Sequence, residues 1–338
     1  MIITRTPFRI SFFGGGTDYP AWFREHGGQV LATSINKYCY ISCRYLPPFF
    51  DHKHRIVYSR IENVKNINEI EHPAIRGVLS WLNWEKGLEI HHDGDLPARS
   101  GLGSSSSFTV GLINSLLALR GERISKKDLG QKAIFVEQDV LQEHVGSQDQ
   151  ISAAYGGFNK ILFHQNGDFS VEPVIISSQR QEELQSHMML FFTGISRNAP
   201  EIAKSKIDNF KDRTIELKTL NNMVDEGMSI LLSKNSPISD FGRLLHESWM
   251  LKRSLSDKVS NAFVDQVYDT ARKNGALGGK ILGAGGGGFF LIFASPEKQA
   301  GIRESLKDLI YVPIRFEFGG SQVVLYQPDG LGERTGDR

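Results

Sequence analysis

Residues 97–107 read Pro-Ala-Arg-Ser-Gly-Leu-Gly-Ser-Ser-Ser-Ser and lead directly into an apolar stretch at 108–117. In that stretch Val110, Ile113 and Leu117 recur at helical spacing, which predicts a helix over residues 105–119. A glycine turn that opens a helix leaves backbone N–H groups unpaired at the positive end of the helix dipole, and such an end binds phosphate. Because one serine would be enough to cap the helix, four consecutive hydroxyls indicate an anionic ligand.

The composition is that of a globular protein with no general affinity for polyanions. The chain has 338 residues, of which 40% are hydrophobic and 23% charged, and this length favours two domains. The formal net charge of +1 gives no overall attraction to nucleic acid or to an acidic membrane, so we expect neither as a partner. No apolar run reaches membrane-spanning length and no cationic, apolar leader opens the sequence, so we expect a cytoplasmic protein.

The pattern of elements predicts two α+β domains. In the first half, strand-like runs are followed by helices at 105–119 and 126–142. The polar stretch Ser177–Ser186 is the expected boundary, which divides the chain into domains at 1–180 and 181–338. In the second half we expect a strand at 188–192, helices at 199–233, 238–254 and 258–274, and closing strands at 289–293, 314–318 and 322–326.

Two further glycine clusters occur, at Gly14–Gly16 and at Gly283–Gly288. The second contains the G-x-G-x-x-G pattern, but the strand-like run at 289–293 follows it where a dinucleotide-binding fold needs a helix. No Gly-Lys-[Ser/Thr] follows either cluster, which excludes a Walker A loop. Dense glycine is costly in chain entropy and suits a backbone that approaches a ligand or another backbone closely.

Three segments together resemble the ordered motifs of the GHMP small-molecule kinases, a superfamily that includes galactokinase, homoserine kinase, mevalonate kinase and phosphomevalonate kinase. They are Pro7–Asp18, Pro97–Ser107 and Lys280–Gly288. The resemblance implies the two-domain GHMP-kinase fold, with an S5-like N-terminal domain that carries the ATP loop and a ferredoxin-like C-terminal domain. It also implies a substrate cleft between the domains, ATP as the phosphoryl donor and Mg²⁺ as its cation.

The same resemblance gives individual residues their expected roles. Asp149 lies in a Gly-Ser-Gln-Asp-Gln segment similar to that of galactokinases, and it would receive the proton of the sugar hydroxyl. Arg9 would keep Asp149 ionised and orient the acceptor oxygen. Glu137 would bind Mg²⁺ together with Ser105, with Ser104 as a near rival. ATP binding is expected at Pro97, Arg99, Ser100, Gly101, Leu102, Gly103, Ser104, Ser105 and Ser106, and substrate binding at Gly14, Gly15, Gly16, Thr17, Asp18, Gly283, Gly285 and Gly286.

The first motif departs from galactokinase at the sugar pocket. Galactokinases carry a glutamate and a histidine where this chain has Gly15 and Gly16, and their loss removes contacts that recognise galactose and opens volume for a larger acceptor. The Gly-Gly-Gly-Thr-Asp form is similar to fucokinases and to D-glycero-D-manno-heptose 7-phosphate kinases. Segments 6–20, 37–50 and 89–108 resemble the latter closely.

That resemblance implies ATP-dependent phosphorylation of the anomeric hydroxyl of a heptose 7-phosphate, giving a 1,7-bisphosphate for nucleotide-activated heptose and surface polysaccharide. A phosphorylated sugar needs cations that ATP does not use, and Arg197, Lys252 and Arg253 are the candidates. A fucokinase or another sugar 1-kinase is the alternative enzyme, and a non-catalytic sugar or ATP sensor is an alternative of another class. The sequence leaves the oligomeric state open, including a homodimer.

Overall fold

Two long strands, β1 (Ile2–Phe13) and β2 (Gly28–Tyr45), form the centre of the first sheet in the computed structural model of the protein. The structure describes residues 1–338 except 99, 195–202, 204, 206, 211 and 330–338. The sheet runs β13-β1-β2-β5-β3-β4, with β12 and β6 also on β2 and β7 on β6. The other members are β3 (His54–Val57), β4 (Ile61–Val64), β5 (Leu88–Gly94), β6 (Phe158–Phe163), β7 (Phe169–Pro173), β12 (Phe316–Glu317) and β13 (Gln322–Tyr326).

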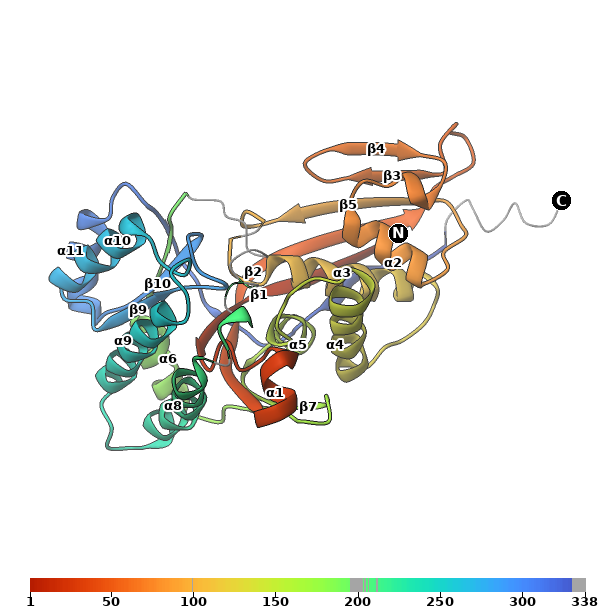
Figure 1. Ribbon diagram of the computed structural model, residues 1–338. Coiled ribbons are helices and arrows are strands. Elements are labelled where there is room, and N and C mark those ends of the chain that lie inside the picture. The colour runs from red at the N-terminus through yellow and green to blue at the C-terminus, as the bar shows by residue number, and fades with distance from the viewer. Residues whose placement is uncertain (99, 195–202, 204, 206, 211, 330–338) are drawn as a thin grey trace.

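Helices cover one face of this sheet (Figure 1). The helix α3 (Ser104–Leu119) packs directly on β1 and β2, and nearly all of its residues are buried. Around it lie α2 (Pro73–Trp81), α4 (Lys126–Phe135) and α5 (Gln148–Tyr155), while α1 (Pro20–His26) follows the glycine turn after β1. The N-terminus of α3 thereby lies beside the middle of β1, near Arg9, and beside the start of α5.

The second domain has a sheet in the order β11-β8-β10-β9. Its strands are β8 (Met188–Phe192), β9 (Gly278–Ile281), β10 (Phe289–Phe293) and β11 (Ile310–Val312). The helices of this part of the chain are α6 (Ser178–Ser186), α8 (Thr214–Leu232), α9 (Ile238–Ser254), α10 (Ala262–Lys273) and α11 (Pro296–Ser305). Of these, α9 and α10 pack on β9, whereas α8 packs on α9 and on β1 and β2 of the first sheet. None of the helices within the described ranges is long and apolar enough to span a membrane.

Several expected elements differ from those observed. At the expected boundary Ser177–Ser186 the chain forms the helix α6, which the Ser177 side chain caps. The strands β12 and β13 pair with β2 and β1, so the expected C-terminal domain at 181–338 does not hold all of its residues. The division near residue 180 otherwise stays a prediction. The expected helix at 126–142 divides into α4 and a π-helical turn at Val136–Val140.

Candidate active site

Arg9 on β1 joins the serine loop, residues 97–107, to the start of α5. Its Nε and Nη2 atoms donate to the two carboxylate oxygens of Asp149 at 2.7 and 2.8 Å. Its Nη1 donates to the Gly101 carbonyl at 2.8 Å, and its backbone N–H donates to the Leu102 carbonyl at 3.0 Å. Arg9 is 3% exposed, whereas the Asp149 side chain is 24% exposed. The buried cation therefore holds a carboxylate that stays accessible to a ligand.

Asp149 lies directly at the mouth of α3. Gly103 precedes the helix with a φ of +74° and has no side chain to cap it. A Cβ atom at Gly103 would lie 3.3 Å from both Asp149 Oδ2 and Arg9 Cγ. The structure thus brings Arg9, Asp149 and the serine loop together, as the sequence led us to expect.

Glu137 is a fully buried carboxylate on the inner side of the same helix terminus. It lies in the π-helical turn, where the Leu141 N–H donates to the Val136 carbonyl five residues back, and such turns often occur at functional sites. Its Oε2 accepts from Ser106 Oγ at 2.9 Å and from the side-chain amide of Gln150. Burial raises the pKa of Glu137 to about 8, and the hydrogen bond from Ser106 opposes that shift. Within the described chain Glu137 Oε1 has no partner, so one buried oxygen is left for a cation.

The serine beside Glu137 differs from the one expected. Ser105 is exposed on the first turn of α3, whereas Ser106 is buried and donates to Glu137. Successive residues on a helix are rotated by about 100°, so counting along the motif does not fix which hydroxyl faces inward. The hydrogen bond from Gln150 to Glu137 was not expected either, although Gln150 directly follows Asp149 in the Gly-Ser-Gln-Asp-Gln segment.

Most of the first glycine motif serves to build the turn after β1. Gly14 has a φ of +81°, and a Cβ there would lie 2.0 Å from the Gln29 carbonyl oxygen. Thr17 is fully buried, with its hydroxyl on the Gly14 and Gln29 carbonyls, so these contacts give it a structural role and substrate binding by Thr17 stays a prediction. Asp18 is 1% exposed, and its two oxygens accept from the Gly16 N–H and from Gln148 Nε2, both at 2.9 Å. Asp18 therefore braces the segment that carries Asp149.

The cations expected at a sugar phosphate are engaged elsewhere. Lys252 is 6% exposed and donates to the Ile281 and Gly283 carbonyls at 2.8 and 2.7 Å, so it supports the third glycine motif. Arg253 pairs with Asp265 at 3.0 Å. These contacts do not favour a phosphate role for either side chain, and phosphate binding by Lys252 and Arg253 stays a prediction. Arg197, and Arg99 of the expected ATP site, lie outside the described residues.

Close backbone packing accounts for the third glycine motif. A Cβ at Gly285 would lie 2.7 Å from the backbone of Val259, and the Gly286 N–H donates to the Val259 carbonyl at 2.8 Å. A Cβ at Gly288 would lie 2.2 Å from the Ser100 carbonyl oxygen. Substrate binding by Gly283, Gly285 and Gly286 stays a prediction.

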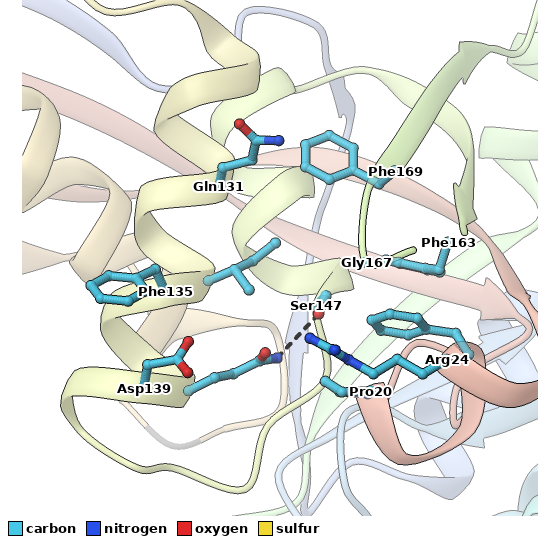
Figure 2. A pocket seen from close by; sticks show the side chains of 12 residues that line it. Pro20, Arg24, Gln131, Phe135, Asp139, Ser147, Phe163, Gly167 and Phe169 are labelled. Carbon is cyan, nitrogen blue, oxygen red and sulfur yellow. Dashed lines mark hydrogen bonds between the residues drawn. The ribbon is translucent and has the colours of Figure 1, made fainter. Parts of the chain in front are cut away.

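A cavity of about 280 Å³ lies behind the start of α5, between α1, α4 and the turn from β6 to β7 (Figure 2). Arg24, Phe135, Asp139 and Phe169 are among its lining residues. Ser147 also lines it, and its hydroxyl accepts from Gln138 Nε2 at 3.1 Å. Neither Arg9 nor Asp149 contributes to its wall, so this cavity is distinct from the candidate active site.

Comparison with known proteins agrees with this geometry. The family description "GHMP kinases N terminal domain" matches residues 65–157, and "GHMP kinases C terminal" matches residues 231–311. The D-glycero-alpha-D-manno-heptose 7-phosphate kinase of Campylobacter jejuni is 30% identical over 321 residues, which cover 90% of this chain and 93% of that protein. The chain belongs to the GHMP kinase family, and the expected enzyme class, an ATP-dependent kinase with this two-domain α+β fold, is confirmed.

Two other comparisons extend the family relation. A bifunctional fucokinase/GDP-fucose pyrophosphorylase of Arabidopsis thaliana is 27% identical over 330 residues, which cover 89% of this chain but 31% of that longer protein. The crystal structure of a D-glycero-D-manno-heptose 1-phosphate kinase from Bacteriodes thetaiotaomicron has a TM-score of 0.78 at 22% identity, and covers 96% of this chain and 99% of that one. That structural likeness shows the fold.

Proposed function

We propose that this GHMP kinase is an ATP-dependent sugar kinase that phosphorylates the C1 hydroxyl of D-glycero-D-manno-heptose 7-phosphate. The observation that carries the proposal is the position of Asp149, held by Arg9 beside Gly103 at the mouth of α3. A base for the acceptor hydroxyl and a seat for the phosphates of ATP are adjacent there, as in-line phosphoryl transfer requires.

The phosphates of ATP bind the serine loop and the N-terminus of α3. The glycine that precedes this helix offers no side-chain cap, so its first-turn N–H groups face the ligand at the positive end of the dipole. Arg9 holds the loop through the Gly101 and Leu102 carbonyls, which keeps the phosphate seat in register with Asp149.

Asp149 accepts the proton of the C1 hydroxyl as that oxygen attacks the γ-phosphorus, while the bond from this phosphorus to the bridging oxygen breaks and ADP leaves. Arg9 occupies one lone pair on each oxygen of Asp149, so each oxygen keeps a further lone pair for a proton. An anomeric hydroxyl is more acidic than an ordinary alcohol, which lowers the demand on this base.

Glu137 and Ser106 would hold Mg²⁺, because Glu137 Oε1 is a buried oxygen with no partner in the described residues and Ser106 Oγ lies beside the same carboxylate. A bound Mg²⁺ would supply neutralising charge for the phosphate oxygens and favour the ionised form of Glu137. Gln150 holds Glu137 Oε2 and so leaves Oε1 as the free ligand atom.

The choice of a heptose phosphate rests on the similarity to the Campylobacter jejuni enzyme and on Gly15 and Gly16, which leave room where galactokinases have larger polar residues. Arg197 is a candidate for the 7-phosphate, and the contacts of Lys252 and Arg253 in the described residues favour those two cations less. A fucokinase is the second candidate function, favoured by the similarity to the Arabidopsis thaliana protein.

A coupled ATP-consumption assay over heptose 7-phosphate, unphosphorylated heptose, fucose, galactose and mevalonate tests this proposal. We expect kcat/KM to be highest for heptose 7-phosphate, and ³¹P NMR of its product to show a new phosphate coupled to the anomeric proton. A preference for fucose would move the function to the second candidate. If none of the sugars is phosphorylated, both candidate functions are overturned.

A further inference from the structure

Several buried polar atoms near the candidate active site lack partners among the described residues. Two of them, the Ser11 hydroxyl oxygen and Gln148 Oε1, belong to residues that both lie next to Gly15. Ser11 is 6% exposed and Gln148 is 8% exposed. Since buried polar atoms normally find a hydrogen-bond partner, each of these two requires an explanation.

Both residues are neighbours of the reaction centre in the chain and in space. Ser11 follows Arg9 by two residues on β1, so the two side chains leave the same face of the strand. Gln148 immediately precedes Asp149. Gly15 lies between them, and a Cβ there would lie 3.9 Å from both Ser11 Oγ and Gln148 Nε2, which is ordinary contact distance. Gly15 is partly exposed, and the space beside it holds a methyl group in ordinary contact with these two side chains.

Asp18 determines which end of the Gln148 amide remains available. Gln148 Nε2 donates to Asp18 Oδ2 at 2.9 Å, and an ionised carboxylate can only accept. The amide nitrogen must face Asp18, so the end left without a partner is the acceptor Oε1. The Ser11 hydroxyl can both donate and accept. Together they suit a ligand hydroxyl that donates to Gln148 and accepts from Ser11.

We propose that Ser11 and Gln148 bind a second hydroxyl of the acceptor sugar, separate from the one that is phosphorylated, and that Gly15 provides the space for it. This inference rests on the proposed sugar kinase function and adds the residues that select the acceptor. A sugar without that hydroxyl leaves both protein groups unpaired on binding, and sites of this kind discriminate strongly against such analogues.

Ser11→Ala is the principal test, because it separates binding from stability. The Ser11 hydroxyl has no partner in the described part of the free protein, so its removal leaves the melting temperature unchanged or raises it. We expect kcat/KM for the acceptor to fall about 3- to 10-fold, as for one neutral hydrogen bond, while KM for ATP stays within about twofold. Gly15→Ala fills the same space and is expected to lower kcat/KM for the acceptor without loss of stability.

Ser115→Ala is the matched control. Ser115 is also fully buried, but its hydroxyl donates to the Leu112 carbonyl at 3.0 Å within α3. That variant should lose stability and keep the KM of the acceptor. If Ser11→Ala behaves like Ser115→Ala, the Ser11 hydroxyl holds a structural water and the inference is wrong.

Monodeoxy analogues of the acceptor identify the hydroxyl. For one ring position, the loss caused by the deoxy sugar and the loss caused by Ser11→Ala should not add, because both remove the same contact. Full additivity at every position overturns the inference. The cycle uses whichever sugar the wild-type enzyme phosphorylates, so a preference for fucose refutes the heptose assignment and still tests Ser11. If no sugar is phosphorylated, the proposed function and this inference fall together.

Discussion

Replacing Asp149 with asparagine tests the arrangement at the mouth of α3. The asparagine oxygen can accept one of the two hydrogen bonds that Arg9 now donates, but its NH₂ group faces the other donor. Loss of one hydrogen bond to a charged group costs about 1.5–3 kcal/mol. Because the Asp149 side chain is 24% exposed and water can enter, we expect the free energy of unfolding to fall by about 2 kcal/mol.

The expected effect on catalysis is much larger than the effect on stability. Loss of a general base lowers the rate by about 10²–10⁴-fold, so kcat for Asp149→Asn should fall at least about a hundredfold. Arg9 still holds the Gly101 carbonyl in the variant, so nucleotide affinity should stay within about threefold. Urea denaturation gives the stability, coupled ATP consumption gives kcat, and titration calorimetry gives the nucleotide affinity.

Asp168→Asn is the matched control, since Asp168 is an exposed carboxylate that pairs with Lys127 at 2.9 Å on the surface. It should change stability by less than about 1 kcal/mol and leave kcat unchanged. If Asp149→Asn keeps kcat within tenfold of the wild type while it binds nucleotide normally, Asp149 is not the base. If the activity of Asp149→Asn falls only in proportion to the fraction of folded protein, the Asp149 carboxylate has a structural role.

Three further predictions concern the metal, the third glycine motif and acid stability. Ser106→Ala should raise the Mg²⁺ concentration for half-maximal activity about tenfold or more, and Ser105→Ala by about twofold or less; the reverse order would restore the original assignment. Lys252→Met should lower the free energy of unfolding by about 3 kcal/mol in urea, because two backbone carbonyls lose a charged donor; a higher KM for the sugar phosphate at unchanged stability would show a ligand role instead. Burial lowers the pKa of His54 from 6.5 to about 4. Between pH 4 and pH 6.5 the unfolded chain therefore binds more protons than the folded protein. The free energy of unfolding should fall by about 2 kcal/mol from pH 7 to pH 5. His54→Leu should flatten that dependence in urea titrations at the two pH values, and an unaltered slope would exclude His54 as its source.

Local patterns predicted the elements that are marked by an apolar run or by helical spacing of apolar residues. The strands at 188–192 and 289–293 and the helix at 238–254 were found with their observed bounds. Short or irregular elements such as α1 and the π-helical turn were missed. In the π-helical turn the observed conformation depends on tertiary contacts of Glu137, which no local pattern contains.

The candidate site could be predicted as far as the motifs specify it. The family resemblance pointed to Arg9, Asp149 and Glu137, and the structure places all three around the N-terminus of α3, while their roles in phosphoryl transfer stay predictions. The direction of a side chain was not available from the motif. The contact of Ser106 with Glu137 and those of Lys252 with backbone carbonyls were therefore not expected, while the ligand roles of Ser105 and Lys252 stay predictions. The sequence alone does not distinguish a lysine that binds a phosphate near a glycine motif from one that donates to the backbone carbonyls of that motif.

The contacts between the two domains explain why the motifs occur together in one chain. The Phe289 N–H donates to the Ser100 carbonyl at 3.0 Å, and the Gly288 backbone fits there only because it has no side chain. Lys280 donates to the Phe12 carbonyl at 2.7 Å, two residues before Gly14. The second domain is therefore bonded to the serine loop and to the end of β1, and both segments are also held by Arg9. A shift of one domain relative to the other would act on the phosphate seat first, so the glycines of the third motif position the first two motifs even where they touch no ligand.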